Sequence, residues 1–143
     1  SKTSKLNFGS FTDGLSNTLH LTESAGRPNI YRNGKLAVTA AQGSNDRVNG
    51  GGWCRPASEL NVLRGASADG TSFPGPNAIN VTNGERLGTY PHPFYNVDGT
   101  GQVYAFHTGG VNALFGDGAV RFLRQSVGIR TLAALVSRNG GEV

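Results

Sequence analysis

The sequence predicts an α+β fold, with an antiparallel, meander-type sheet, long Gly/Asn-rich loops and one C-terminal helix. Three observations support this class. The 143 residues form a single globular domain by length and include 22 glycines, which favour turns. Short segments alternate between apolar and polar residues, as half-buried strands do. A helical spacing of apolar residues is found near the C-terminus.

The N-terminal segment contains a turn followed by a strand. An apolar stretch ends in Asp13-Gly14, which is a turn signal and, just before Ser16, a candidate cap for a short helix. Residues 18–24 alternate between apolar and polar side chains, which predicts a half-buried strand with Leu19 and Leu21 on its apolar face.

A β-hairpin is expected next, around Asn33-Gly34, because this dipeptide favours the tight turns that join two strands. Ile30 and Tyr31 precede the turn, and residues 36–38 follow it. Residues 39–102 carry no long periodic segment, and a loop region of this length usually has a function or hides short strands.

The segment from His107 to Leu123 is the most informative part of the chain. With the residues before it, it predicts three strands joined by tight turns at 108–110 and 116–118. The expected strands are 103–106, 111–115 and 119–123.

A helix is predicted after these strands. Ser126 is its candidate N-cap, and Asn139-Gly140 supplies its stop signal. Its apolar positions are Val127, Ile129, Leu132, Ala133 and Val136.

Charge and composition exclude several functional classes. The net charge of +4 comes from scattered cations, without the basic run or aromatic pattern of a nucleic-acid binder. No apolar segment is long enough to span a membrane, so no membrane contact is expected of this segment. Cys54 is the single cysteine, so no intrachain disulfide forms, and we expect it to be buried and inert. The chain starts with Ser1, which suggests a trimmed fragment with a targeting segment upstream.

His107 and Asp117 are the candidate catalytic residues if the protein is an enzyme, although strand geometry argues against a dyad. An extended segment from 111 to 115 spans roughly 15 Å at ~3.3 Å per residue, whereas a hydrogen bond needs about 3 Å. We therefore expect His107 to hold the 108–110 turn, and Asp117 with Gly118 to form a primed hairpin turn. The expected turn anchors are His107, Gly109, Gly110, Asp117, Gly118, Asp13, Gly14 and Asn17.

Metal sites receive little support from the sequence. The three histidines, His20, His92 and His107, lack the short spacing of zinc ligands. Calcium is the candidate cofactor, since it accepts carboxylates and loop carbonyls. Its candidate ligands are Asn96, Asp98 and Thr100, with Asp13, Asp46 and Asp69 in other loops.

Hydrolysis and sugar binding are two further candidate activities. A serine hydrolase needs a nucleophile elbow, which the chain lacks. Aromatic residues beside Asn and Gly could stack on sugars, and the alternative is that they fill the core beneath the loops. These candidate ligand-binding residues are Trp53, Tyr31, Tyr90, Phe94 and Tyr95.

Several blocks of the chain resemble one protein family. His107 through Gly118 fits an H-X9-DG signature, and Thr131 through Val143 is similar to the family's closing block. Further blocks resemble it in the same order along the chain. They are Phe11-Thr-Asp-Gly-Leu-Ser-Asn-Thr18 with Glu23, Trp53-Cys-Arg-Pro56 and Pro74-Gly-Pro-Asn-Ala-Ile-Asn-Val-Thr-Asn-Gly84. The chain thus resembles DUF1559, a pseudopilin-related (PulG-like) family of exported proteins of planctomycete type.

The resemblance implies a pseudopilin-like globular domain that follows a prepilin leader and an apolar helix. Relatives often carry a cysteine where this chain has residues 77–81, so packing must replace any disulfide there. We expect an exported structural or assembly subunit without catalysis, at the cell surface, outside the cell or in the periplasm. Its partners would be other pilin-like subunits or a surface polymer. The alternatives are a carbohydrate- or solute-binding domain and a small hydrolase.

Overall fold

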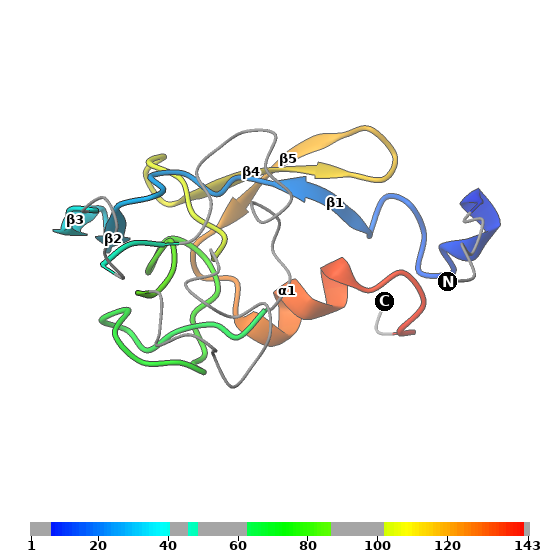
Figure 1. Ribbon diagram of the computed structural model, residues 1–143. Helices are drawn as coiled ribbons and strands as arrows, with labels where there is room; N and C mark the ends of the chain where they lie inside the picture. Colours follow the sequence, from blue (N-terminus) through cyan, green and yellow to red (C-terminus); the bar gives the residue numbers. More distant parts are fainter. Residues whose placement is uncertain (1–6, 41–45, 49–62, 87–101, 142–143) are drawn as a thin grey trace, which may run out of the picture.

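The computed structural model describes residues 7–40, 46–48, 63–86 and 102–141 of the chain. Its strands and its C-terminal helix are segregated along the sequence, which confirms the α+β class (Figure 1). In chain order the elements are the 3-10 helix η1 (Phe8–Ser10), β1 (Leu19–Thr22), β2 (Ile30–Arg32), β3 (Lys35–Val38), β4 (Gly110–Phe115), β5 (Val120–Arg124) and the helix α1 (Ile129–Val136).

The main sheet has three antiparallel strands in the order β1-β4-β5, so β4 is central. The two predicted hairpins are present. β2 pairs with β3 across Asn33-Gly34, where both residues have positive φ as a primed turn requires. β4 pairs with β5 across residues 116–119. At the other end of β4, Gly110 approaches β5 so closely that a Cβ there would collide with the carbonyl oxygen of Leu123.

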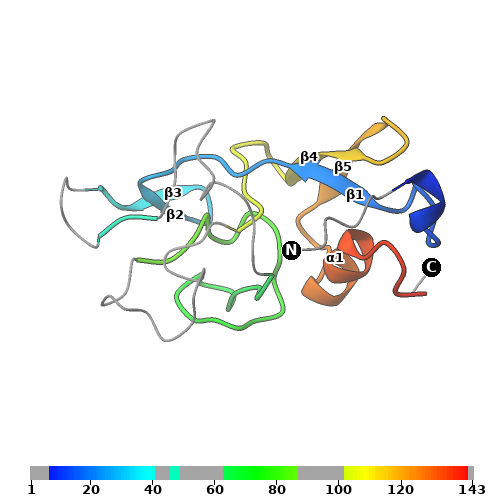
Figure 2. The same cartoon turned by 45° about the vertical axis from the view of Figure 1, so that its right-hand side comes forward.

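The core lies between one face of the main sheet and α1, which runs beneath it in Figures 1 and 2. Val111 on β4 and Leu132 on α1 are both almost fully buried. They pack with Ile79 and Val103, which come from irregular segments. Within the described ranges, no helix is long and apolar enough to cross a membrane.

The predicted strand at 103–106 is wrong. Val103 and Tyr104 each make one isolated parallel bridge, to Ile79 and Ser24 respectively, and the chain then bends at Phe106. The place beside β4 is taken by β1. The amide of Ala105 is satisfied by a side chain, since it donates to the Oδ1 atom of Asn80 at 2.7 Å.

The predicted inward orientation of Leu21 is also wrong. Leu19 pairs with Phe115 and Leu21 pairs with Leu114, so two residues of β1 oppose one step of β4. This β-bulge turns Leu21 to the outer face, where its side chain is 61% exposed. A bulge of this kind leaves no mark in an alternating sequence pattern.

Two predicted caps are wrong as well. The N-cap of α1 is Gly128, without a side-chain hydrogen bond, and Ser126 lies in the preceding turn. The Val127 amide closes that turn onto the Arg124 carbonyl, which delays the helix by two residues. Near the N-terminus, the segment after Ser16 is a turn, and the short helix is η1, centred on Gly9.

Candidate functional site

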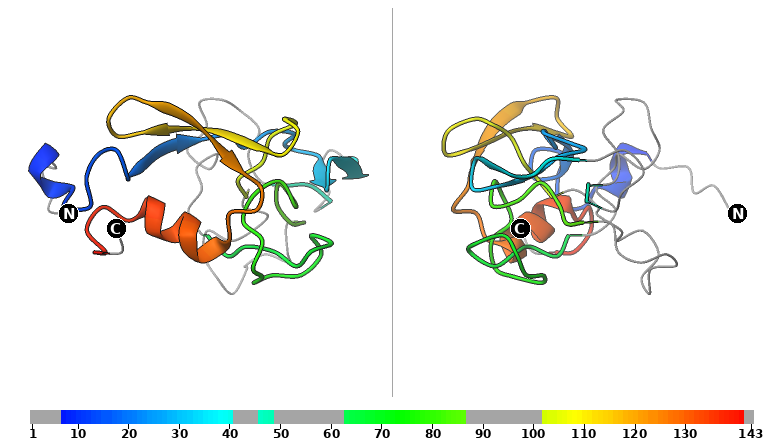
Figure 3. Two further views of the ribbon diagram at one scale, coloured as in Figure 1. Left: turned by 180° about the vertical axis from the view of Figure 1, so that it is seen from behind. Right: turned by 60° about the vertical axis from the view of Figure 1, so that its left-hand side comes forward.

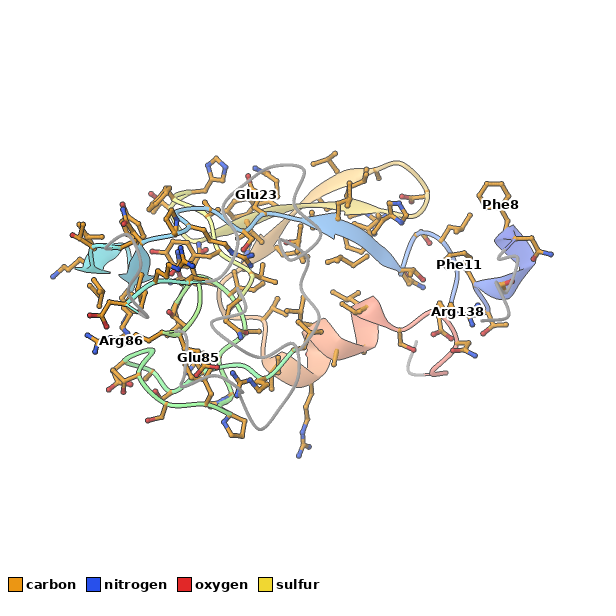
Figure 4. All side chains as sticks on the ribbon, in the orientation of Figure 1. Phe8, Phe11, Glu23, Glu85, Arg86 and Arg138 are labelled. Atoms are coloured by element: carbon orange, nitrogen blue, oxygen red, sulfur yellow. The ribbon has the colours of Figure 1, made fainter. Side chains whose placement is uncertain are left out.

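Glu23 is the centre of the site because it joins β1, β4 and the loop before β4. It follows β1 directly, and its Oε2 accepts a hydrogen bond from the Asn112 amide at 2.7 Å. Its Oε1 lies 3.1 Å from Nε2 of His107. Figure 4 labels Glu23 between β1 and the segment that leads to β4. The carboxylate only accepts, so Nε2 of His107 is the donor in this contact, which leaves Nδ1 for other partners.

Asp117 is at the opposite end of β4 from His107 and serves the hairpin turn. Its Oδ1 accepts from the Ala119 amide at 2.9 Å, and its Oδ2 accepts from Arg121 at 3.0 Å. The predicted primed turn is wrong, because Gly118 has φ +86 whereas Asp117 is not among the residues with positive φ. The Gly118 amide donates to the Phe115 carbonyl, which closes an unprimed turn over residues 115–118. Gly118, the last residue of this turn, has the left-handed conformation.

The turn at Asp13 contacts residues 138–141 near the C-terminus. The buried Asp13 carboxylate accepts from the amides of Gly140 at 2.8 Å and Gly141 at 3.1 Å, and the Asp13 amide donates to the Arg138 carbonyl. Figure 4 shows Phe11 and Arg138 at this end of the molecule. Asn17 folds back onto the same turn, where its Nδ2 donates to the Asp13 carbonyl. Asp13 therefore ties the N-terminal segment to the end of the chain.

Two asparagines that the sequence reasoning missed organise the loops around the site. Asn83 is fully buried, and its Nδ2 donates to the carbonyls of Ala25 and Asn29 while its Oδ1 accepts from the Tyr31 amide. Asn80 has φ +59, and its Nδ2 donates to the Gly110 carbonyl at 2.8 Å. Both lie in the block at 74–84, where the density of Asn beside apolar residues was the available signal.

A pocket of about 430 Å³ opens beside His107. It lies between the β2–β3 turn, the loop before β4 and the end of β5. The hydroxyl of Tyr104 closes its base by accepting from the Gly34 amide at 3.1 Å, and burial raises the pKa of that hydroxyl. The lining residues are Asn33, Gly34, Asn80, Tyr104, Ala105, Phe106, His107, Thr108, Gly109 and Gln125.

Two aromatic side chains, Tyr104 and Phe106, line this pocket, and Tyr31 packs against both. Phe106 is 59% exposed, and its ring stands nearly perpendicular to that of Tyr31, with 4.9 Å between ring centroids. The ring of Tyr104 is also perpendicular to that of Phe106, with 5.7 Å between ring centroids and an interplanar angle of 90°. Tyr31, a predicted ligand-binding residue, thus supports Phe106, which the sequence reasoning placed in a strand.

A second pocket, of about 520 Å³, lies between Arg64, residues 74–76 and the start of α1. Arg64 pairs with Glu85 and lies over the Phe73 ring, 5.2 Å from its centroid. Burial lowers the pKa of this guanidinium. Arg64 is thus held by interactions within the protein, and the exposed Arg130 also lines this pocket.

Most of the predicted ligands and binding aromatics lie outside the described residues. Among the described residues, no group of three His, Cys, Asp or Glu side chains could hold a metal ion. His20 is exposed on β1, apart from the Glu23–His107 pair. The predicted positions outside the described ranges are Trp53, Cys54, Tyr90, His92, Phe94, Tyr95, Asn96, Asp98 and Thr100.

Comparison with known proteins gives one match. No curated protein and no solved structure shows significant similarity to the chain. The model of DUF1559, described as a family of proteins of unknown function, matches residues 1–130. This match covers most of the 143 residues, and it ends within the first residues of α1. The chain belongs to the DUF1559 family.

Proposed function

We propose that this protein is an exported, pseudopilin-like structural subunit that associates with pilin-like subunits, including copies of itself, and performs no catalysis. The observation that carries the proposal is the outer face of the main sheet, opposite α1. Leu21, Leu114, Val120 and Phe122 form an apolar patch there, which we call the outer patch.

The register of the strands defines the outer patch. Leu114 pairs with Leu21 on one side and with Val120 on the other, so these three side chains form a row across the sheet. Phe122 lies on the same face, two residues further along β5. Val120 is 66% exposed and Phe122 is 49% exposed. Contiguous exposed apolar surface of this kind is typical of protein–protein contacts.

The chemistry of the family signature supports the same function. The acidic groups of Asp13, Glu23 and Asp117 each accept from at least one main-chain amide. Carboxylates used in this way fix the path of the backbone and satisfy its donors. Their role is therefore to build the surface on which association depends. The resemblance to pseudopilins supports export to the periplasm or cell surface as part of this proposal.

The test is association in solution, measured by sedimentation velocity at rising protein concentration. We expect the natural chain to self-associate, and the variant L21S/V120T/F122S to do so at least about hundredfold more weakly, because three buried apolar contacts are lost. Leu36→Ser is the matched control, since Leu36 is 51% exposed on β3, away from the patch. A natural chain that stays monomeric at all concentrations, or a control as weak as the triple variant, would contradict the proposal.

A further inference from the structure

We propose that the pocket beside His107 binds a neutral sugar ring of a polysaccharide, with Phe106 as its stacking platform. This binding function is independent of the outer patch, which is built from other residues. Its volume of about 430 Å³ lies within the ~300–1,000 Å³ range of small-molecule sites.

Phe106 has the properties of a stacking platform. Its two near-perpendicular contacts with Tyr31 and Tyr104 fix the orientation of the ring. More than half of its surface nevertheless remains open to solvent, at 59% exposure. A fixed, open aromatic ring offers a sugar an apolar contact for its C–H groups without a large loss of side-chain entropy on binding.

The polar groups around the pocket suit hydroxyl groups. Within the described part of the chain, the side chains of Thr108 and Gln125 make no hydrogen bond, so both are available to a ligand. The Glu23 carboxylate orients His107 through Nε2, which leaves Nδ1 to make a hydrogen bond with a sugar hydroxyl. Hydroxyl groups both donate and accept, and this mixed set of partners matches them.

The charge of the lining selects a neutral ligand. Apart from the imidazole of His107, the lining side chains are amide, hydroxyl, aromatic or apolar, without lysine, arginine or carboxylate. An acidic sugar would bring a carboxylate to a site with no fixed cation to pair with it, and burying an unpaired charge is costly. The geometry therefore favours uncharged hexose or N-acetylhexosamine units over uronic acids.

The test is NMR titration of the isotope-labelled chain with cellohexaose and chitohexaose as neutral probes and trigalacturonic acid as the acidic probe. We expect at least one neutral probe to bind and to shift the amide signals of His107, Thr108 and Gln125. Phe106→Ala should weaken that binding by about tenfold or more, and Gln125→Ala by a few fold. Phe8→Ala is the matched control, because Phe8 is an exposed phenylalanine on η1, outside both the pocket lining and the outer patch.

Any one of three results would overturn the inference. They are absence of binding by both neutral probes, tighter binding of trigalacturonic acid than of the neutral probes, and unchanged affinity of Phe106→Ala. An unaltered amide spectrum beyond the pocket is the check that Phe106→Ala is folded. Because Gln125 lies at the rim and is exposed, Gln125→Ala provides a second, structurally mild readout.

Discussion

The two halves of the molecule satisfy their backbones in different ways. In the sheet half (β1, β4, β5 and α1), main-chain ladders and helical bonds pair most amides and carbonyls. In the loop half (residues 24–40, 63–86 and 102–109), asparagine side chains make many of the hydrogen bonds to main-chain amides and carbonyls. The left view of Figure 3 shows the two halves from behind, with the main sheet and helix beside the green loops and the cyan β2–β3 hairpin.

The difference shows what a buried asparagine can replace. Its amide presents one acceptor and two donors, the same groups that a neighbouring strand would offer. Asn83 thus pairs with the backbone at Ala25, Asn29 and Tyr31 although no regular strand runs beside them all. A loop held in this way keeps an irregular shape, and the pocket beside His107 depends on that shape. We infer that the loop half carries ligand recognition, whereas the sheet half carries the core of the fold and the outer patch.

Replacement of Asn83 by alanine should have the largest effect, and this effect should be confined mainly to the loop half. It removes three hydrogen bonds from a fully buried site and leaves three backbone groups without partners. Unsatisfied buried groups cost about 1–3 kcal/mol each and relaxation recovers part, so we expect the free energy of unfolding to fall by about 3–5 kcal/mol. Urea denaturation measures it.

Asn139→Ala is the control, because Asn139 is exposed and should change stability by less than about 0.5 kcal/mol. Hydrogen exchange separates the halves further. The Tyr31 amide should exchange much faster in Asn83→Ala, whereas the β4 amides should keep their relative protection. If Asn83→Ala is as stable as the natural chain, asparagine does not hold the loop half.

The sheet half is tested by Leu132→Ala. Leu132 is 1% exposed and packs against Val111 and Ile79 in the core. Its loss should lower the free energy of unfolding by about 2–4 kcal/mol, through lost burial and the cavity left behind. Val136→Ala on the same helix is the control, since Val136 is 44% exposed and should cost less than about 1 kcal/mol. Equal effects of the two substitutions would place the core elsewhere.

The sequence predicted the elements that depend on neighbouring residues, in both halves, better than the features that depend on distant partners. Hairpins at Asn33-Gly34 and Asp117-Gly118 and the helix through Leu132 follow from local turn chemistry and periodicity. These signals depend only on residues that are close together in the sequence. The turn of Leu21 to the outer face depends on a bulge, which is set by pairing with β4 and leaves no local pattern.

The candidate site depended on contacts between distant residues, and the sequence could supply only part of it. His107 stood out by its signature, but its partner Glu23 is 84 positions away. Asn83 and Tyr31 are 52 positions apart. A strand was expected at 103–106 because its side chains are apolar, and Asn80 instead takes the place of a neighbouring strand there. Composition marked these asparagines as turn formers and could not reveal their buried partners.

The smallest expected effect is an acid titration confined to one turn of the loop half. Hydrogen bonds from the Ser67 hydroxyl and from the Thr71 hydroxyl and amide lower the pKa of Asp69 from 3.8 to about 2. A lowered carboxyl pKa adds stability that is fully present above pH 3.8 and is lost as the pH falls from there toward 2. Because Asp69 is fully solvent-exposed, the effect on global stability should be slight.

Carbon-detected NMR titration of the Asp69 carboxyl measures this pKa directly. Ser67→Ala removes the first of its hydrogen bonds and should raise the pKa toward the usual value, whereas Ser126→Ala, at an exposed turn beyond β5, should leave it unchanged. The amides of β4 should not respond to the titration, since the carboxylate bonds only within residues 67–71. A pKa near 3.8 in the natural chain would show that this turn is open in solution. The asparagine-held half would then be less well ordered than the sheet half, and the pocket beside His107 would have to form on binding.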